Sequence, residues 1–170
     1  MAAHGSPPHP VVLGAFGRSV GFLASQTGTA TARRFKQALG ELELEPRQFG
    51  LMRAIDAAGS PTQQVLGDVL QIPASSMVAL LDHLEAIALV ARRPHPTDRR
   101  ARVVVLTEAG RAVLVRATEV AIATEQAICC GLSEAERETL IELLLHVAAN
   151  LGLAEGVHPG MPAREPCGAG

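Results

Sequence analysis

The residues best suited to chemistry form a basic cluster in the middle of the chain. Five arginines fall within eleven residues, at Arg92, Arg93, Arg99, Arg100 and Arg102. Arginine binds phosphate through two parallel hydrogen bonds and enters narrow minor grooves of DNA. Asp98 could orient Arg100 by a fork-like ion pair. The cluster predicts a surface for an anionic partner, and a solvated basic turn is the alternative.

The residues before this cluster predict the helices that would position it. Apolar residues at spacings of three and four predict a helix that ends near Ile87, with an inward stripe of Met77, Leu80, Leu81, Leu84 and Ile87. A shorter helix with Val65, Leu66, Val69 and Leu70 precedes it. Two short helices joined by three or four residues are typical of a helix-turn-helix. An ordinary helical hairpin in a bundle is the alternative.

The outward face of the second of these helices is small and nearly free of strong base readers. Its solvent-facing residues and their flanks are Ser75, Ser76, Val78, Ala79, Asp82, His83 and Ala86. The N-terminal half of such a helix enters the major groove, where hydroxyls bond either type of base and methyls contact thymine. No Arg, Lys, Asn or Gln precedes His83 on this face, so strong bidentate reading of guanine or adenine is not expected.

Two strands follow and carry the basic cluster on a hairpin. They are expected at residues 89–93 and 102–106, where the β-branched run 103–105 favours the second strand. The loop 94–101 between them is basic and rich in turn residues. This turn directly follows the helix that would enter the major groove. Its position therefore favours DNA binding over a solvated turn.

The N-terminal half of the chain predicts further helices. The first runs from about Val11 to Leu39 and is weakened around Gly28. The second begins at Pro46, because proline suits the first helical turn. Ser60 is expected to cap the third helix, which contains the short apolar segment described above.

Two helices are predicted after the hairpin. Thr107 can cap the fifth helix, and Ser133 with Glu136 forms a capping box that opens the sixth. The sixth helix is apolar over most of its circumference, so it must be covered on several sides. In a chain of 170 residues, a second subunit is the natural cover.

Composition limits the class of protein. The chain has 48% hydrophobic and 19% charged residues, which suits one domain with a core. Only 2% are aromatic, so an aliphatic core is expected and modules that stack bases on aromatic rings are nearly excluded. No transmembrane helix or signal peptide is expected, so a cytoplasmic protein with no membrane partner is predicted.

Charge and order vary along the chain. Residues 1–116 hold 13 basic and 9 acidic side chains, whereas residues 117–170 hold 2 basic and 8 acidic ones. An anionic partner should therefore meet the first part. Residues 1–10 and 153–170 lack apolar periodicity and are expected to be flexible tails.

Specific motifs lie on these elements. The segment Asp98-Arg99-Arg100 is followed by Leu106-Thr107-Glu108-Ala109-Gly110, and is preceded by Leu84-Glu85, Leu89-Val90-Ala91-Arg92-Arg93 and Leu44-Glu45-Pro46-Arg47-Gln48-Phe49. Together they resemble the MarR family of winged helix-turn-helix transcription regulators over residues 11–152.

The resemblance implies a fold that is mainly α with a small β-hairpin. It consists of a winged helix-turn-helix DNA-binding lobe, residues 44–106, and a helical dimerisation region, residues 11–40 and 107–152. MarR proteins are homodimers, which agrees with the broad apolar face of the sixth helix.

The resemblance also implies roles for residues. Arg100 is the wing arginine placed in the minor groove, Asp98 supports it, and Arg93 and Arg102 would touch phosphates. The full set expected to bind DNA is Ser75, Ser76, Ala79, His83, Arg93, His95, Asp98, Arg99, Arg100 and Arg102.

Two positions depart from the family pattern. Ala79 stands where members often have a basic residue, and Ala88 stands where they have glycine before Leu89-Val90. Ala79 lowers the expected strength of base reading. If the turn at Ala88 needs a positive φ, a non-glycine residue there costs about 1 kcal/mol.

The predicted function is that of a homodimeric, sequence-specific repressor that binds a pseudo-palindromic operator in double-stranded DNA. Many MarR proteins are relieved by a small-molecule effector, often an aromatic acid. Arg18 is the candidate partner for an effector carboxylate, and an exposed helix arginine is the alternative. A dimeric helical interaction module of the same fold, which does not bind DNA, is a second possible function.

Other chemistry has weaker support. Cys129 and Cys130 suggest a thiol-based redox sensor, although adjacent cysteines near a helix end are more often buried hydrophobes. Cys167 lies in the C-terminal tail and is interpreted as incidental. No Gly-rich phosphate loop, Gly-x-Ser-x-Gly, His-x3-His or Cys-x2-Cys pattern occurs, so no enzyme activity, metal site or cofactor is predicted.

Overall fold

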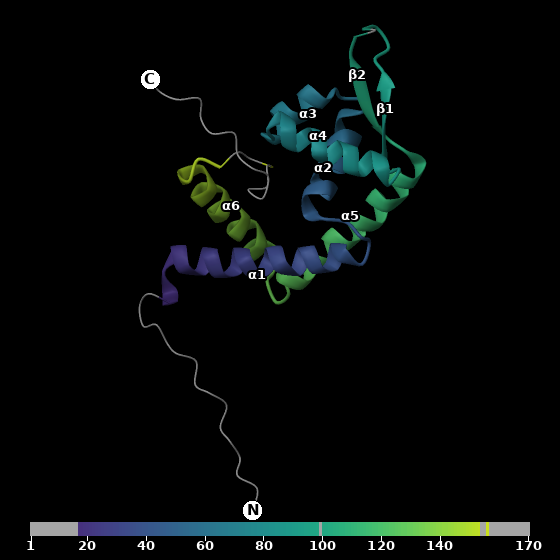
Figure 1. Ribbon diagram of the computed structural model, residues 1–170. Helices are drawn as coiled ribbons and strands as arrows, with labels where there is room; N and C mark the ends of the chain where they lie inside the picture. Colours follow the sequence, from purple (N-terminus) through teal and green to yellow (C-terminus); the bar gives the residue numbers. More distant parts are fainter. Residues whose placement is uncertain (1–16, 99, 154–155, 157–170) are drawn as a thin grey trace, which may run out of the picture. The chain divides into compact units, whose positions relative to one another are not determined.

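The computed structural model describes residues 17–98, 100–153 and 156 (Figure 1). The elements along these residues are α1 (Val20–Gly40), α2 (Pro46–Ala58), α3 (Gln63–Leu70), α4 (Ala74–Ala86), β1 (Val90–Pro94), β2 (Arg102–Leu106), α5 (Glu108–Ile128) and α6 (Glu134–Asn150). The predicted six helices and one β-hairpin are confirmed. The chain divides into two compact units between Arg34 and Phe35.

The first unit contains the N-terminal part of α1. Residues 17–18 form a short 3-10 turn, and the Ser19 hydroxyl accepts a hydrogen bond from the backbone N–H of Phe22 at 3.3 Å. Among the described residues, α1 therefore begins at Val20, whereas residues 17–19 were also expected to be helical. It continues unbroken through Gly28, because one helical glycine costs only about 1 kcal/mol. Residues 1–16, 154, 155 and 157–170, which include most of both predicted tails, lie outside the described residues.

The helix-turn-helix lies in the second unit and is followed directly by the wing hairpin, β1 and β2. Helices α3 and α4 meet at a bend of 117°, within the range typical of this motif. The predicted cap of α3 is wrong: Thr62, not Ser60, is its N-cap, and its hydroxyl accepts from the backbone N–H of Val65 at 3.3 Å. The chain at 61–62 is extended because it pairs with β2, where Val104 N–H donates to the Pro61 carbonyl at 2.8 Å.

Helix α4 buries the predicted stripe except at its end. Met77, Leu81 and Leu84 are fully buried and Leu80 is nearly so. Ile87 was expected to face inward, but it follows the last helical residue and is 43% exposed. Helix α4 therefore ends at Ala86, one residue earlier than the apolar spacing predicted.

Ala88 makes the turn from α4 into the wing. Its φ is +57°, so the turn does need a positive φ and a residue with a Cβ occupies the left-handed region. The following N–H, that of Leu89, donates to the Leu84 carbonyl at 2.9 Å and closes the helix end. Strand β1 then pairs antiparallel with β2, in a register that joins Val90 to Leu106 and Pro94 to Arg102.

The segment between β2 and α5 is tightly packed. The Thr107 hydroxyl donates to the Ala88 carbonyl at 2.7 Å and accepts from the Gly110 N–H at 2.9 Å, which confirms Thr107 as the cap of α5. A Cβ on Gly110 would lie 1.9 Å from the Leu89 carbonyl oxygen. Only glycine lets α5 approach the wing this closely, which explains the Thr-x-x-Gly spacing in physical terms.

The core of the second unit is aliphatic, as composition predicted. Its largest fully buried side chains are Leu39, Leu51, Met52, Ile55, Leu66, Ile72, Met77, Leu81, Leu84, Val90 and Val104. Phe35 and Phe49 contribute one edge-to-face contact, with ring centroids 5.7 Å apart. No single helix among the described residues is long and apolar enough to cross a membrane, and only the bent pair α3–α4 meets those criteria jointly.

Helix α6 differs from the helices of this core. Its start is as predicted, with Ser133 and Glu136 forming a capping box. None of its residues is buried in the single chain, although it carries a run of apolar side chains. Those at least 42% exposed are Leu140, Ile141, Leu143, Leu144 and Leu145.

Candidate nucleic-acid interface

The outward face of α4 is arranged as the periodicity predicted. Ser75, Ala79 and His83 are exposed, and Ser76 is half-buried. They lie on the side of α4 opposite the buried stripe, so the helix can present short polar and methyl groups to a groove. No side chain on its N-terminal half is long enough and suitably polar to read a base edge bidentately.

The wing tip is held by a compact set of turn hydrogen bonds. Asp98 Oδ1 accepts from the backbone N–H of Arg100 at 2.9 Å. His95 Nδ1 accepts from the N–H groups of Thr97 and Asp98 at 3.3 and 3.2 Å. The expected fork-like ion pair is therefore replaced, among the described wing residues, by support of the Arg100 backbone. This arrangement leaves the Arg100 guanidinium exposed at the tip.

Among the described arginines of the cluster, Arg92 is the half-buried one. Its guanidinium contacts Asp82 Oδ1 at 2.6 Å and pairs with Glu85, and its backbone N–H donates to Glu85 Oε1 at 3.1 Å. Both acidic residues lie on α4, so Arg92 fastens the wing to the recognition helix. The backbone and side-chain hydrogen bonds from Arg92 lower the pKa of Glu85. Arg92 was predicted to be a free cation like its neighbours, because nothing in the sequence indicates that it pairs with Asp82 and Glu85.

The other wing arginines keep their charge available. Within the described residues, Arg93, Arg100 and Arg102 are exposed, and no ion pair engages their guanidinium groups. Arg99, also expected to bind DNA, lies outside the described residues. The hairpin thus presents unpaired guanidinium groups next to α4, which is suited to binding phosphate.

A hollow of about 400 Å³ lies between the start of α2 and the outward face of α4. We call it the α2–α4 hollow, and its lining residues are Glu45, Arg47, Gln48, Ser76, Ala79, Leu80 and His83. Three expected DNA-binding residues thus share one concave surface with Arg47. Arg47 was not predicted to bind DNA, because it lies before the helix-turn-helix in the sequence.

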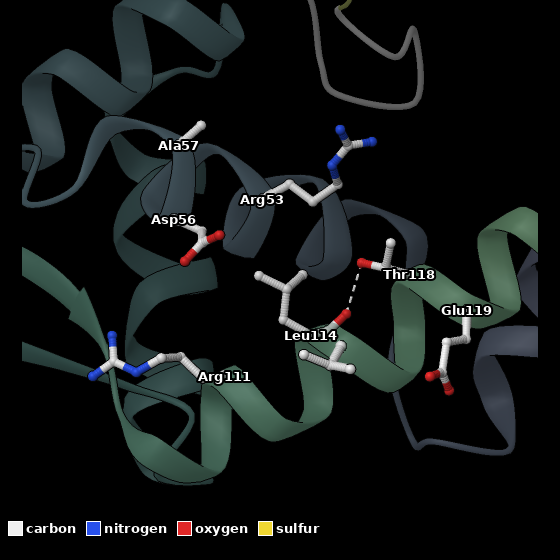
Figure 2. Close-up of a pocket in the computed structure, with 8 residues that line it drawn as sticks. Arg53, Asp56, Ala57, Arg111, Leu114, Thr118 and Glu119 are labelled. Atoms are coloured by element: carbon white, nitrogen blue, oxygen red, sulfur yellow. Dashed lines mark hydrogen bonds between the residues drawn. The ribbon is translucent and has the colours of Figure 1, made fainter.

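A second hollow, of about 430 Å³, lies between α2 and α5 (Figure 2). We call it the α2–α5 hollow, and it is lined by Arg53, Asp56, Ala57, Arg111, Leu114, Val115, Thr118 and Glu119. The Arg53 guanidinium also lies 5.9 Å from the centroid of the Phe49 ring. The lining is aliphatic with charges of both signs, so it suits a small organic molecule that carries an anionic group. Arg18, the effector candidate, lies in the first unit and is exposed.

The cysteine environment disfavours a reactive thiolate at Cys129. Its Sγ donates to Glu125 Oε1 at 3.5 Å, and desolvation together with this carboxylate raises the pKa of the thiol. Because the thiolate is the nucleophile, this shift works against redox sensing at Cys129. Cys130 is exposed, and Cys167 lies outside the described residues. Among the described residues, no cluster of His, Cys, Asp or Glu is placed to hold a metal ion.

Comparison with known proteins yields consistent matches. The model of the MarR family matches residues 42–101. A transcriptional regulatory protein assigned to the hcr operon of Thauera aromatica is 30% identical over 135 residues, which are 79% of this chain and 81% of that protein.

Two solved structures are also similar. CouR, a transcriptional repressor bound to a 23-mer DNA duplex, is 28% identical with a TM-score of 0.71, and the match covers 80% of this chain and 96% of CouR. BpsR of Bordetella bronchiseptica, whose DNA binding is regulated by 6-hydroxynicotinic acid, is 26% identical with a TM-score of 0.67. That match covers 84% of this chain and 98% of BpsR.

Proposed function

The chain belongs to the MarR family of transcriptional regulators, and from this premise we propose that it is a cytoplasmic repressor acting as a homodimer on a pseudo-palindromic operator. Each copy inserts the outward face of α4 into a major groove and its wing into the neighbouring minor groove. Two copies meet successive grooves about 34–36 Å apart.

The unpaired arginines of the wing are the observation that carries this proposal. Arg93, Arg100 and Arg102 are exposed next to α4, while Arg92 is ion-paired with Asp82 and Glu85 of α4. Since α4 offers only small groups for base reading, phosphate contacts and groove shape supply a large share of the binding free energy. CouR, one of the similar solved structures, is a transcriptional repressor bound to DNA.

Homodimerisation is supported by the apolar surface of α6 and the adjoining chain. Five consecutive or nearly consecutive apolar residues of α6 are 42–57% exposed, and Leu151 just beyond it is 70% exposed. An exposed apolar face of this length marks a protein contact in a water-soluble protein. A second copy of the same helix provides matching apolar cover.

Relief by a small ligand is supported by the α2–α5 hollow. Residues of α2 and α5 line this hollow. Helix α2 precedes the helix-turn-helix in the chain, and α5 is followed by the apolar helix α6. A ligand that prefers one arrangement of these two helices shifts the protein toward the state with that arrangement. Regulation of BpsR by 6-hydroxynicotinic acid is a precedent among similar structures.

The test compares Arg100→Ala with Ser75→Ala on a duplex selected by the wild-type protein from random double-stranded DNA. Fluorescence anisotropy at two salt concentrations, with excess competitor DNA, measures both affinity and its salt dependence. We expect Arg100→Ala to weaken binding about 10- to 100-fold and to reduce the salt slope, and Ser75→Ala to have a smaller effect. Equal, small effects would refute the assignment, and failure of the wild type to select any duplex would favour an interaction module without DNA binding.

A further inference from the structure

The α2–α4 hollow places an arginine from outside the helix-turn-helix beside the recognition helix. Arg47, in the first turn of α2, lines the same concave surface as Ser76, Ala79 and His83 of α4. These α4 residues face the groove in the proposed complex. Whatever surface of DNA meets them therefore also meets the wall that carries Arg47.

Arg47 provides the guanidinium group of this hollow. It is exposed, and no ion pair engages it in the part of the chain that the structure describes. The acidic residue beside it, Glu45, is instead paired with Lys36 at 3.1 Å. Gln48 is 5% exposed, and its Oε1 accepts from the Glu45 N–H at 2.7 Å, so it is committed to the start of the helix.

The charge also compensates for what α4 lacks. Ala79 provides only a methyl group, and the outward face of α4 carries no cationic side chain before His83. Asp82, further along this face, is paired with Arg92 and so contributes little free negative charge. A guanidinium beside this helix has five N–H donors available for the phosphate oxygens that border a major groove.

We propose that Arg47 binds a DNA phosphate at the edge of the major groove entered by α4, and so supplies from α2 the cation that the recognition helix does not carry. This inference rests on the proposed DNA-binding function. It adds a binding residue that belongs neither to the wing nor to the helix-turn-helix. A phosphate contact contributes affinity without reading sequence, which distinguishes it from a contact to a base edge.

The test measures Arg47→Ala, Arg47→Lys and Arg116→Ala against the duplex selected by the wild type, by anisotropy over a series of salt concentrations. Arg116 is exposed on α5, outside both hollows, so Arg116→Ala makes the same charge change at a neutral location. We expect Arg47→Ala to weaken binding about 10-fold and to reduce the salt slope by about one, because one phosphate contact is lost. Arg47→Lys should retain most of the affinity, since lysine also binds phosphate as a point charge.

The outcomes separate this inference from the broader function. If Arg47→Ala behaves like Arg116→Ala while Arg100→Ala loses binding, the Arg47 contact is wrong and DNA binding stands. If Arg47→Ala changes the preference among single-base variants of the duplex, the contact is to a base and the phosphate assignment is overturned. If the wild type selects no duplex, DNA binding itself fails. Unchanged thermal unfolding of Arg47→Ala would show that any loss comes from the contact rather than from folding.

Discussion

Helices α4 and α6 both carry rich apolar faces, yet within the described part of the chain only the face of α4 is buried. Helix α4 buries Met77, Leu81 and Leu84 completely against its own lobe, whereas α6 buries no residue. Burying one leucine fully contributes about 1.5–3 kcal/mol. The contrast teaches that the lobe buries its core within one chain, while α6 leaves an apolar face exposed, as the proposed homodimer requires.

The same contrast holds for the charges. Asp82 and Glu85 of α4 pair with Arg92, and within the described residues no ion pair engages Arg93 or Arg100. On α6, the capping carboxylate of Glu136 is used to start the helix, and its hydrogen bonds from Ser133 lower the pKa of that carboxyl. The first region exposes cations beside α4, whereas α6 exposes apolar side chains among acidic ones, which suits the proposed DNA and the proposed second copy respectively.

The largest effect is expected from making α6 polar. The double variant Leu140→Asp/Leu144→Asp puts two charges on its exposed face, so the paired state should dissociate because a charge cannot be buried there cheaply. Sedimentation velocity should show a monomer, and affinity for the operator should fall by at least about 100-fold as the second half-site is lost. Val69→Asp, at an exposed apolar position on α3, is the control for oligomeric state and should leave the dimer intact. Persistence of the dimer in the double variant would remove α6 from the interface.

A smaller but still large effect is expected at the contact between the wing and α5. Gly110→Ala forces a Cβ to within 1.9 Å of the Leu89 carbonyl oxygen, so the backbone must shift. We expect a loss of about 3 kcal/mol in the free energy of unfolding, at the upper end for an overpacked site. Gly28→Ala is the control, since no atom lies near its Cβ and alanine favours the helix. Urea unfolding of the two variants measures both, and equal stabilities would contradict the close packing described here.

A modest gain is expected from relieving the turn after α4. Ala88→Gly removes a Cβ from a residue with φ of +57°, which should stabilise the lobe by about 0.5–1 kcal/mol. Part of the gain is offset by the greater freedom of glycine in the unfolded chain. Urea unfolding with an unchanged m-value is the measurement. A destabilised Ala88→Gly would mean that the left-handed turn carries no strain.

The smallest effect concerns acid stability of the link between α4 and the wing. Because the pKa of Glu85 is lowered in the folded state, its contribution is present above the ordinary glutamate value of 4.5 and is lost as the pH falls through the lower folded value. The link is exposed, so solvent screening keeps the contribution small. The melting temperature of wild type should therefore fall toward that of Glu85→Gln below pH 4.5, with the difference between them largest near neutrality. A difference that grows on acidification would contradict the sign of the shift.

Local signals predicted the fold well. Capping residues such as Thr107 and Ser133 and the apolar stripe of α4 act over a few residues, so the sequence alone identifies the elements they start or bury. The cap of α3 was missed because Thr62 is held by β2, which lies some 40 residues further along the chain. Ile87 was misassigned because helical periodicity says nothing about where the helix ends.

The site was less predictable than the fold. Exposure of Ser75, Ala79 and Arg100 follows from periodicity and turn position. The pairing of Arg92 does not, because a long side chain reaches from β1 to two carboxylates on α4. Arg47 was missed for the same reason: only the folded chain brings the start of α2 and the outward face of α4 to one concave surface.

Native mass spectrometry of the full chain with the selected duplex tests the central claim most directly, because it counts chains and DNA in one complex. If the free arginines bind DNA and α6 pairs two copies, wild type should give two chains on one duplex. Arg100→Ala should then remain a dimer with a clearly smaller share of duplex-bound complex, and Leu140→Asp/Leu144→Asp should be a monomer. A stable complex of one chain with one duplex, unaffected by both variants, would contradict the account.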